Sequence, residues 1–148
     1  MDTIDRQLID LLRDNARLPY AELARKVGLS APAVHERVGK LESSGVIRGY
    51  RAEVEPETLG LPLTAVIGIV QDSSGDTDAV LEALRDRQEI ESCYFMAGEE
   101  SFLCKARVKT IGDLERLIVD LNRVQGVART RTSIALSTKW EGRIRPAG

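Results

Sequence analysis

The sequence predicts an α+β protein of two domains, and three observations carry this prediction. Apolar residues repeat at helical spacing through residues 1–45, and a segment typical of a β-hairpin follows, so residues 1–53 are expected to form a winged helix-turn-helix. From residue 64 onward, strands and helices are expected in the order βαββαβ, as in ferredoxin-like folds. Residues 54–63 contain two prolines and a glycine, which is typical of a linker. The second domain is therefore expected over residues 64–148.

Local signals define the first two helices. Asp2 or Thr3 can cap the first helix, and Asn15 is a plausible stop. The second helix is expected over residues 20–27. Gly28 ends it, because this position needs a residue that readily adopts a left-handed conformation.

The turn between the second and third helices is the most informative local motif. Ala24 is small and lets the two helices approach, Gly28 makes the turn, and Val34 packs the third helix onto the second. Ser30 caps the third helix. This spacing is typical of a helix-turn-helix that places its second helix in a major groove, although a helical corner in another bundle has the same pattern.

Charge is distributed unevenly along the chain. The net charge is −2, but between residues 17 and 51 seven Lys and Arg residues stand against three Glu residues, a local charge of +4. A basic region of this size indicates phosphate contact, and a solvated helix face is the alternative interpretation. A wing is expected at residues 45–54, at the end of this region.

The candidate DNA-binding residues lie at the start of the third helix or on its face opposite the buried stripe, and two more are cations of the wing. They are Ser30, Pro32, Ala33, His35, Arg37, Lys40, Arg48 and Arg51. Arg37 has the geometry to span guanine O6 and N7. Lys40, Arg48 and Arg51 suit phosphates, which position a protein without reading sequence. Glu36 is expected to pair with a neighbouring cation.

The second half alternates between two periodicities. Strands are expected over residues 64–71, 90–97, 101–109 and 127–137, and helices over residues 77–87 and 111–123. Helices on one face of such a sheet leave the other face bare, with Val66, Val70, Met96 and Leu103 on it. A second copy of the chain is the simplest cover for that face, so at least a homodimer is expected.

A series of motifs resembles one family, the Lrp/AsnC or feast/famine regulators. The motifs are Ile4-Asp5-Arg6, Asn15-Ala16-Arg17, Glu22-Leu23-Ala24, Val27-Gly28-Leu29-Ser30, Glu36-Arg37-Val38 and Gly45-Val46-Ile47-x-Gly49-Tyr50. The resemblance covers essentially the whole chain. It implies a transcription regulator that binds double-stranded DNA, and an ACT-like second domain that binds an effector and oligomerises. It further implies dimers that assemble into octamers, with an amino acid bound between subunits.

The chain departs from the family pattern in the expected effector turn. Family members often carry Gly-x-x-Asp before the third strand of this domain, whereas this chain has Gly98-Glu99-Glu100-Ser101. Ser101 lacks the charge to hold an ammonium group, so Glu99, Glu100 or backbone groups have to substitute; a solvated turn is the alternative for the two glutamates. The candidate effector residues are Met96, Gly98, Glu99, Glu100, Ser101, Thr132 and Ser133, although threonine is also simply a good strand former.

Two other classes of protein share parts of this pattern. Siroheme decarboxylases have the same two-domain fold, but they need imidazole groups, and the single histidine here, His35, falls in the helix-turn-helix. No catalytic triad, metal cluster or phosphate loop is found, and Cys93 and Cys104 are too few and too far apart for a zinc site or a disulfide framework, so neither enzyme activity nor a cofactor is expected. A stand-alone amino-acid sensor would not need the helix-turn-helix. Without a membrane span or signal sequence, a cytoplasmic, nucleoid-associated protein is expected.

Overall fold

The computed structural model describes residues 1–146, and the chain divides into two compact units. The first unit contains Met1–Glu53, and the second contains Val54–Lys139. Residues 140–146 group with the first unit, where the guanidinium of Arg13 donates a hydrogen bond to the backbone carbonyl of Arg145. This return of the chain end was not expected from the sequence.

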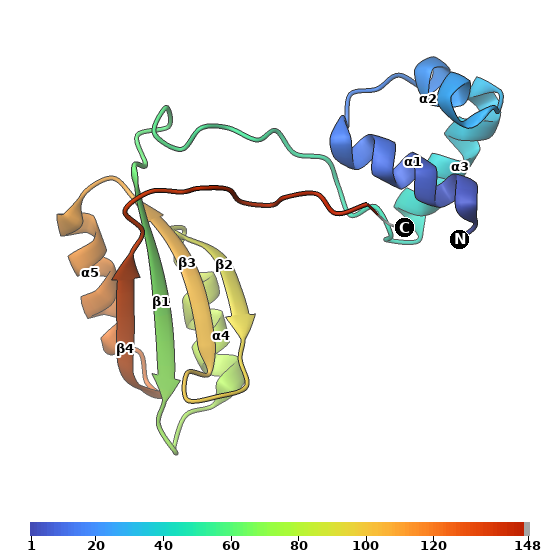
Figure 1. Ribbon diagram of the computed structural model, residues 1–148. Coiled ribbons are helices and arrows are strands. Elements are labelled where there is room, and N and C mark those ends of the chain that lie inside the picture. The colour runs from blue at the N-terminus through green and yellow to red at the C-terminus, as the bar shows by residue number, and fades with distance from the viewer. Residues whose placement is uncertain (147–148) are drawn as a thin grey trace. The chain divides into compact units, whose positions relative to one another are not determined.

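Three helices form the first unit: α1 (Thr3–Asp14), α2 (Tyr20–Val27) and α3 (Ala31–Ser43) (Figure 1). Asp2 caps α1, since its carboxylate accepts the N–H of Asp5, and the Asp5 carboxylate accepts the N–H of Asp2 in return. Asn15 follows the last residue of α1. Both expected limits of this helix are confirmed.

The turn between α2 and α3 has the expected geometry. Gly28 has a left-handed φ of 73°, and its N–H donates to the carbonyl of Ala24 at 2.9 Å. The Ser30 hydroxyl accepts the N–H of Ala33 at 3.3 Å and so caps α3. The core that this turn brings together contains the fully buried side chains of Leu8, Leu23 and Val34. The helix-turn-helix is therefore confirmed.

The predicted wing does not form as a hairpin. In the part of the chain that the structure describes, residues 46–62 contain no strand. The N–H of Ile47 donates to the carbonyl of Leu41 at 2.9 Å and fixes the exit from α3. An isolated two-stranded hairpin is marginal unless an apolar side packs against something. Here the apolar side chains remain about half exposed: Val46, Tyr50 and Val54.

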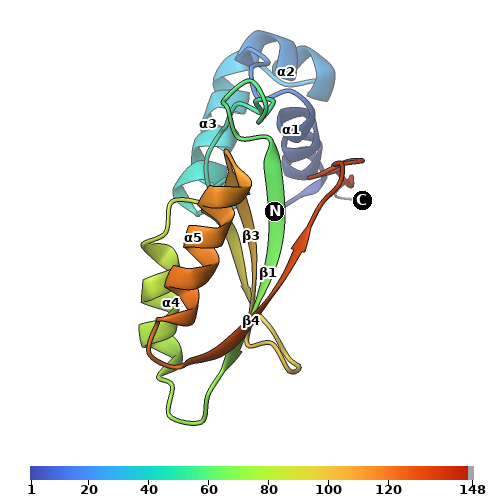
Figure 2. The ribbon, with the colours of Figure 1, turned by 90° about the vertical axis from the view of Figure 1, so that its left-hand side faces the viewer.

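The second unit is one antiparallel sheet with two helices on one of its faces (Figures 1 and 2). Its elements are β1 (Leu63–Gln71), α4 (Thr77–Arg85), β2 (Ile90–Phe95), β3 (Phe102–Val108), α5 (Ile111–Asn122) and β4 (Val127–Ile134). The strand order is β2-β3-β1-β4. The βαββαβ prediction is confirmed, with element limits that differ from the expected ones by a few residues.

Strand β1 lies between β3 and β4, and its alternate side chains face the two sides of the sheet. Ala65, Ile67 and Ile69 are fully buried toward the helices, in one core with β3, α4 and α5. None of the helices in residues 1–146 is long and apolar enough to span a membrane.

The other face of the sheet is largely open, with one exception to the prediction. Val66 and Met96 are exposed by 38% and 39%, and Leu103 is half-buried. Val70 lies on this face as predicted, opposite Arg129 of β4, but it is only 8% exposed, so it is covered and not bare. The N–H of Ser101 donates to the carbonyl of Ile69 at 2.7 Å, which ties the turn before β3 to β1 beside Val70.

Gly126 is expected to be essential where the turn before β4 packs closely against Gly75 and Val80. It has a φ of +97°, and a Cβ there would lie 2.9 Å from the Cα of Gly75 and 3.0 Å from Cγ2 of Val80. Gly126→Ala should lower the free energy of unfolding by about 1–3 kcal/mol, through backbone strain and overpacking. The measurement is urea unfolding of the full chain. The control is Gly112→Ala in α5, where the nearest atom lies 3.7 Å away. Equal unfolding midpoints for the two variants would contradict the close approach.

Candidate functional sites

Helix α3 presents a continuous exposed face opposite its buried stripe. Val34, Val38 and Leu41 are buried as predicted. The eight DNA-binding candidates differ in exposure, with Ala33 and Arg37 half-buried and the rest exposed: Ser30, Pro32, His35, Lys40, Arg48 and Arg51. The ring of His35 lies 4.8 Å from the ring of Tyr20 on α2. This contact packs the N-terminal part of the exposed α3 face against the preceding helix.

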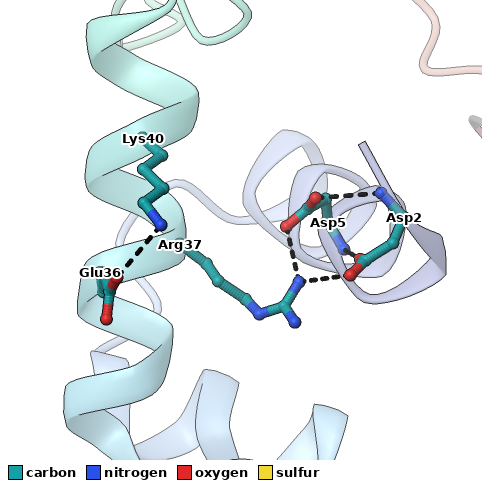
Figure 3. Close-up of polar contacts among 5 residues, drawn as sticks. All are labelled: Asp2, Asp5, Glu36, Arg37 and Lys40. Atoms are coloured by element: carbon teal, nitrogen blue, oxygen red, sulfur yellow. Dashed lines mark hydrogen bonds and ion pairs between the residues drawn. The ribbon is translucent and has the colours of Figure 1, made fainter.

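Arg37 lies on the side of α3 that faces α1, where two carboxylates bind it (Figure 3). Its Nη1 is 2.7 Å from Oδ2 of Asp2 and 3.1 Å from Oδ1 of Asp5. These are the two residues of the α1 capping box. Two hydrogen bonds hold the pKa of Asp2 below its usual value: the larger effect comes from Arg37, and the smaller from the N–H of Asp5. The guanidinium therefore joins the start of α1 to α3 and is not free to read a base in this conformation.

Lys40 is held much more loosely than Arg37. Its Nζ is 3.1 Å from Oε1 of Glu36, one helical turn back, so Glu36 has the neighbouring cation that was predicted (Figure 3). The two side chains are 76% and 68% exposed. An exposed pair of this kind contributes only about 0–1 kcal/mol, so exchanging Glu36 for a phosphate costs little.

Arg48 and Arg51 follow α3 in the segment that lacks strands. Both are exposed, and neither has an ion pair among residues 1–146. They line an open groove of about 670 Å³ together with residues of α1, including Ile9 and Arg13. Two unpaired cations beside an exposed helix face suit contact with a polyanion.

The turn from Gly98 to Ser101 is folded over the open face of the sheet. Glu99 forms an ion pair with Arg129 and lies 3.6 Å from Arg131, and Glu100 lies 3.7 Å from Arg131. Both arginines come from β4. Sequence reasoning missed them, although their alternate positions on a predicted strand signal a shared face.

A glycine of β1 makes room for this turn. A Cβ at Gly68 would lie 2.7 Å from Cγ of Glu100, so the Glu100 side chain crosses the sheet directly over Gly68. The N–H of Met96 donates to the carbonyl of Ser101 at 2.8 Å and closes the base of the turn. Gly98 has a φ of +133° and open space where a Cβ would be. The turn thus combines acceptors, a hydroxyl and two adjacent cations.

The two candidates on β4 lie on opposite faces of the sheet. Ser133 stands opposite Val66 on the open face, the face of Arg131. Thr132 stands opposite Ile67 on the helix face, and its buried hydroxyl has no hydrogen-bond partner within the described chain. The structure therefore brings Ser133 to the side of the turn and does not bring Thr132 there.

Within residues 1–146, no cluster of three or more His, Cys, Asp or Glu side chains is arranged to hold a metal ion. Both units contain ion pairs between arginine or lysine and carboxylates at the candidate sites. Such arrangements bind and exchange anions, which is the chemistry that the two sites have in common.

Two family models match the chain. Residues 1–42 match the AsnC-type helix-turn-helix domain, and residues 64–144 match the Lrp/AsnC ligand binding domain. The second match alone spans more than half of the chain.

Relatives resemble the chain over nearly its full length. The HTH-type transcriptional regulator LrpA of Mycobacterium tuberculosis is 39% identical over 143 residues, covering 97% of this chain and 95% of that protein. The structure of Escherichia coli AsnC superposes with a TM-score of 0.89 at 31% identity, covering 97% of each chain. A feast or famine regulatory protein of M. tuberculosis complexed with L-methionine also superposes with a TM-score of 0.89, at 40% identity over 98% of each chain.

The link between Arg37 and the α1 cap predicts a pH-dependent difference in stability. The pKa of Asp2 is lowered in the folded protein, so its stabilising contribution is complete above the ordinary value of 3.8 and is lost as the pH falls through the lowered value. Arg37→Gln should therefore be less stable than the wild type at neutral pH, and the difference should shrink well below pH 3.8. Urea unfolding at the two pH values measures it.

Arg48→Gln is the control for this experiment, because it removes an exposed arginine with no ion pair in the described residues. It should show no such pH-dependent difference. A deficit of Arg37→Gln that is the same at both pH values would mean that Arg37 stabilises the unit by packing rather than by its charge.

Proposed function

Since the chain belongs to the Lrp/AsnC family of transcription regulators, we propose that it binds double-stranded DNA through α3 and an amino-acid effector at the Gly98–Ser101 turn. The family models place an AsnC-type helix-turn-helix domain before an Lrp/AsnC ligand binding domain. The observation that carries the DNA half is the capped, exposed α3 that follows the left-handed Gly28. Regulators of transcription are not enzymes, and the absence of catalytic activity is part of the proposal.

On DNA, the exposed face of α3 enters the major groove. Pro32 and His35 then approach the base edges, and Lys40 exchanges Glu36 for a phosphate. Arg48 and Arg51 contact the backbone beside the groove, and the α3 N-terminus at Ser30 and Ala33 favours a phosphate through its N–H groups and dipole. Arg37 has a different role from the base contact expected from the sequence: it positions α3 through the α1 carboxylates.

Lys40→Ala is expected to weaken binding to specific and random duplexes alike. Losing one phosphate contact should flatten the plot of log affinity against log salt concentration by about 0.9 per contact. The measurement is a salt titration of fluorescence anisotropy, with a duplex from the region upstream of the protein's own gene and a scrambled duplex. Lys109→Ala, an exposed lysine of the second unit, is the matched control. An unchanged salt slope for Lys40→Ala would remove Lys40 from the DNA surface.

For the effector, the two arginines of β4 are the proposed carboxylate site. The Glu99 carboxylate already lies beside Arg129 and Arg131. The α-carboxylate of an amino acid can therefore replace the Glu99 carboxylate without leaving either arginine unpaired. Glu100 and backbone carbonyls then face the ammonium group, a role that Ser101 cannot fill by charge. The relative complexed with L-methionine supports an amino acid as the ligand class, and so does an L-Met complex of a Neisseria meningitidis regulator.

Assembly belongs to the same proposal. The open sheet face carries exposed apolar side chains, among them Val66, Tyr94 and Met96. A second copy of the chain covers this face in a homodimer, and dimers assemble into octamers. The effector turn lies against the same face, so ligand binding and subunit packing act on common residues.

Arg131→Gln is expected to weaken amino-acid binding by about tenfold or more, because a charge-assisted hydrogen bond to the carboxylate is lost. Calorimetry with L-methionine, or with the tightest-binding member of an amino-acid panel, measures it. The control is Arg123→Gln, an exposed arginine at the end of α5. DNA affinity without effector should stay unchanged in both variants. Wild-type amino-acid affinity in Arg131→Gln would place the carboxylate elsewhere.

A further inference from the structure

Cys93 on β2 and Cys104 on β3 stand directly opposite each other in the antiparallel ladder. Both are free thiols, and their Sγ atoms lie 3.7 Å apart, with the Cys104 thiol donating a hydrogen bond to the Cys93 sulfur. Their separation in the sequence had argued against a disulfide framework. The β2–β3 hairpin brings them together.

The position of the pair in the ladder favours a covalent bond between them. The N–H of Met96 donates to the carbonyl of Ser101, and hydrogen-bonded and non-hydrogen-bonded pairs alternate along an antiparallel ladder. Three positions further along, Cys93 and Cys104 therefore form a non-hydrogen-bonded pair, for which the Cα atoms are about 4.5 Å apart. Disulfides form at Cα separations of about 4.4–6.8 Å.

The two thiols are chemically unequal. Cys93 is exposed, whereas Cys104 is 1% exposed. Burial, and secondarily the neighbouring Cys93, raise the pKa of the Cys104 thiol to about 12. Cys104 therefore keeps its proton and donates it in a hydrogen bond to the Cys93 sulfur. An oxidant in solution reaches Cys93 first.

We propose that Cys93 and Cys104 are an oxidation site at which a hydroperoxide produces an intrachain disulfide. The Cys93 thiolate attacks a peroxide oxygen, the O–O bond breaks, and Cys93 becomes a sulfenic acid while water or an alcohol leaves. The Cys104 sulfur then attacks the Cys93 sulfur, the S–O bond breaks, and the Cys104 proton leaves with the hydroxide as water. The two thiols lose two electrons and the peroxide gains them. A dithiol reverses the reaction by exchange.

The disulfide encloses residues 94–103, and this loop contains the whole Gly98–Ser101 turn. A cross-link across the edge strand β2 prevents the hairpin from opening and so restrains the turn that Glu99 and Glu100 hold over the sheet. The link to effector binding rests on the proposed function, but formation of the disulfide does not. The two are distinguished by measuring the bond and the ligand separately.

The test uses the reduced full-length protein and equimolar hydrogen peroxide at neutral pH. Intact mass under non-reducing conditions should show a single chain that has lost two hydrogen atoms, and peptide mapping should join the Cys93 and Cys104 peptides. Dithiothreitol should restore the original mass. Hydrogen exchange of the amides in residues 94–103 should be slower in the oxidised protein than in the reduced protein.

Two single variants establish the order of events. Cys104→Ala should accumulate a sulfenic acid at Cys93 that dimedone captures, whereas Cys93→Ala should remain almost unlabelled. The wild-type mass measurement needs neither variant, so the test survives if the buried substitution impairs folding. A disulfide between two chains, over-oxidation of Cys93 without a cross-link, or exchange in residues 94–103 that oxidation leaves unchanged would each overturn the proposal.

Discussion

The register of β1 against β3 and β4 is the constraint on which the second unit depends. Side chains alternate strictly across a strand, so a slip of β1 by one residue would move its buried side chains to the open face. With the observed register, Ile67 points into the core between Cys104 and Thr132, and Gly68 lies on the open face between Leu103 and Arg131. The core, the room for Glu100 and the arginine pair are three consequences of one alignment.

Both candidate sites contain cations that are paired with the chain's own carboxylates, and exposure decides which of these pairs can be exchanged. Lys40 and Glu36 are both more than two-thirds exposed, so a phosphate competes with Glu36 easily. Arg131 and Glu99 are 57% and 51% exposed and fall in the same class. Arg37 is only 32% exposed and Asp5 17%, and Asp2 adds a second carboxylate. This difference separates a cation that is fixed between two helices from cations whose carboxylate partners can be exchanged.

Sequence reasoning succeeded where the cause is local. The cap at Asp2, the left-handed Gly28 and the bounds of α2 each follow from a few neighbouring residues. It failed where the partner is distant in sequence. The periodicity of α3 identifies its buried stripe, but it does not reveal that Asp2 and Asp5 lie beside Arg37. The wing hairpin and the exposure of Val70 were mispredicted for the same reason, since both depend on what packs against them.

The candidate effector site shows the same division. The turn could be located from its motif, but the arginines that hold it lie on β4, some thirty residues further along the chain. Alternation on a strand predicts that Arg129 and Arg131 share a face, and only the strand order shows that this face meets the turn. Cys93 and Cys104 became a pair in the same way, once the hairpin register was known.

The exposure of the effector turn also sets how a ligand can act on the protein. In the proposed effector site, an amino acid that replaces Glu99 exchanges one ion pair for another, and such an exchange by itself changes the isolated subunit very little. A ligand shifts an equilibrium only by its differential affinity for the two states. Under the proposed function, the difference in affinity therefore has to arise where the displaced turn meets another surface. The proposed homodimer supplies such a surface at the open sheet face beside the turn, where Val66 and Met96 are exposed. The reciprocity of linkage then requires that subunit packing in the proposed dimer alter effector affinity by the same factor, so the proposal makes the assembled form and the effector site two parts of one equilibrium.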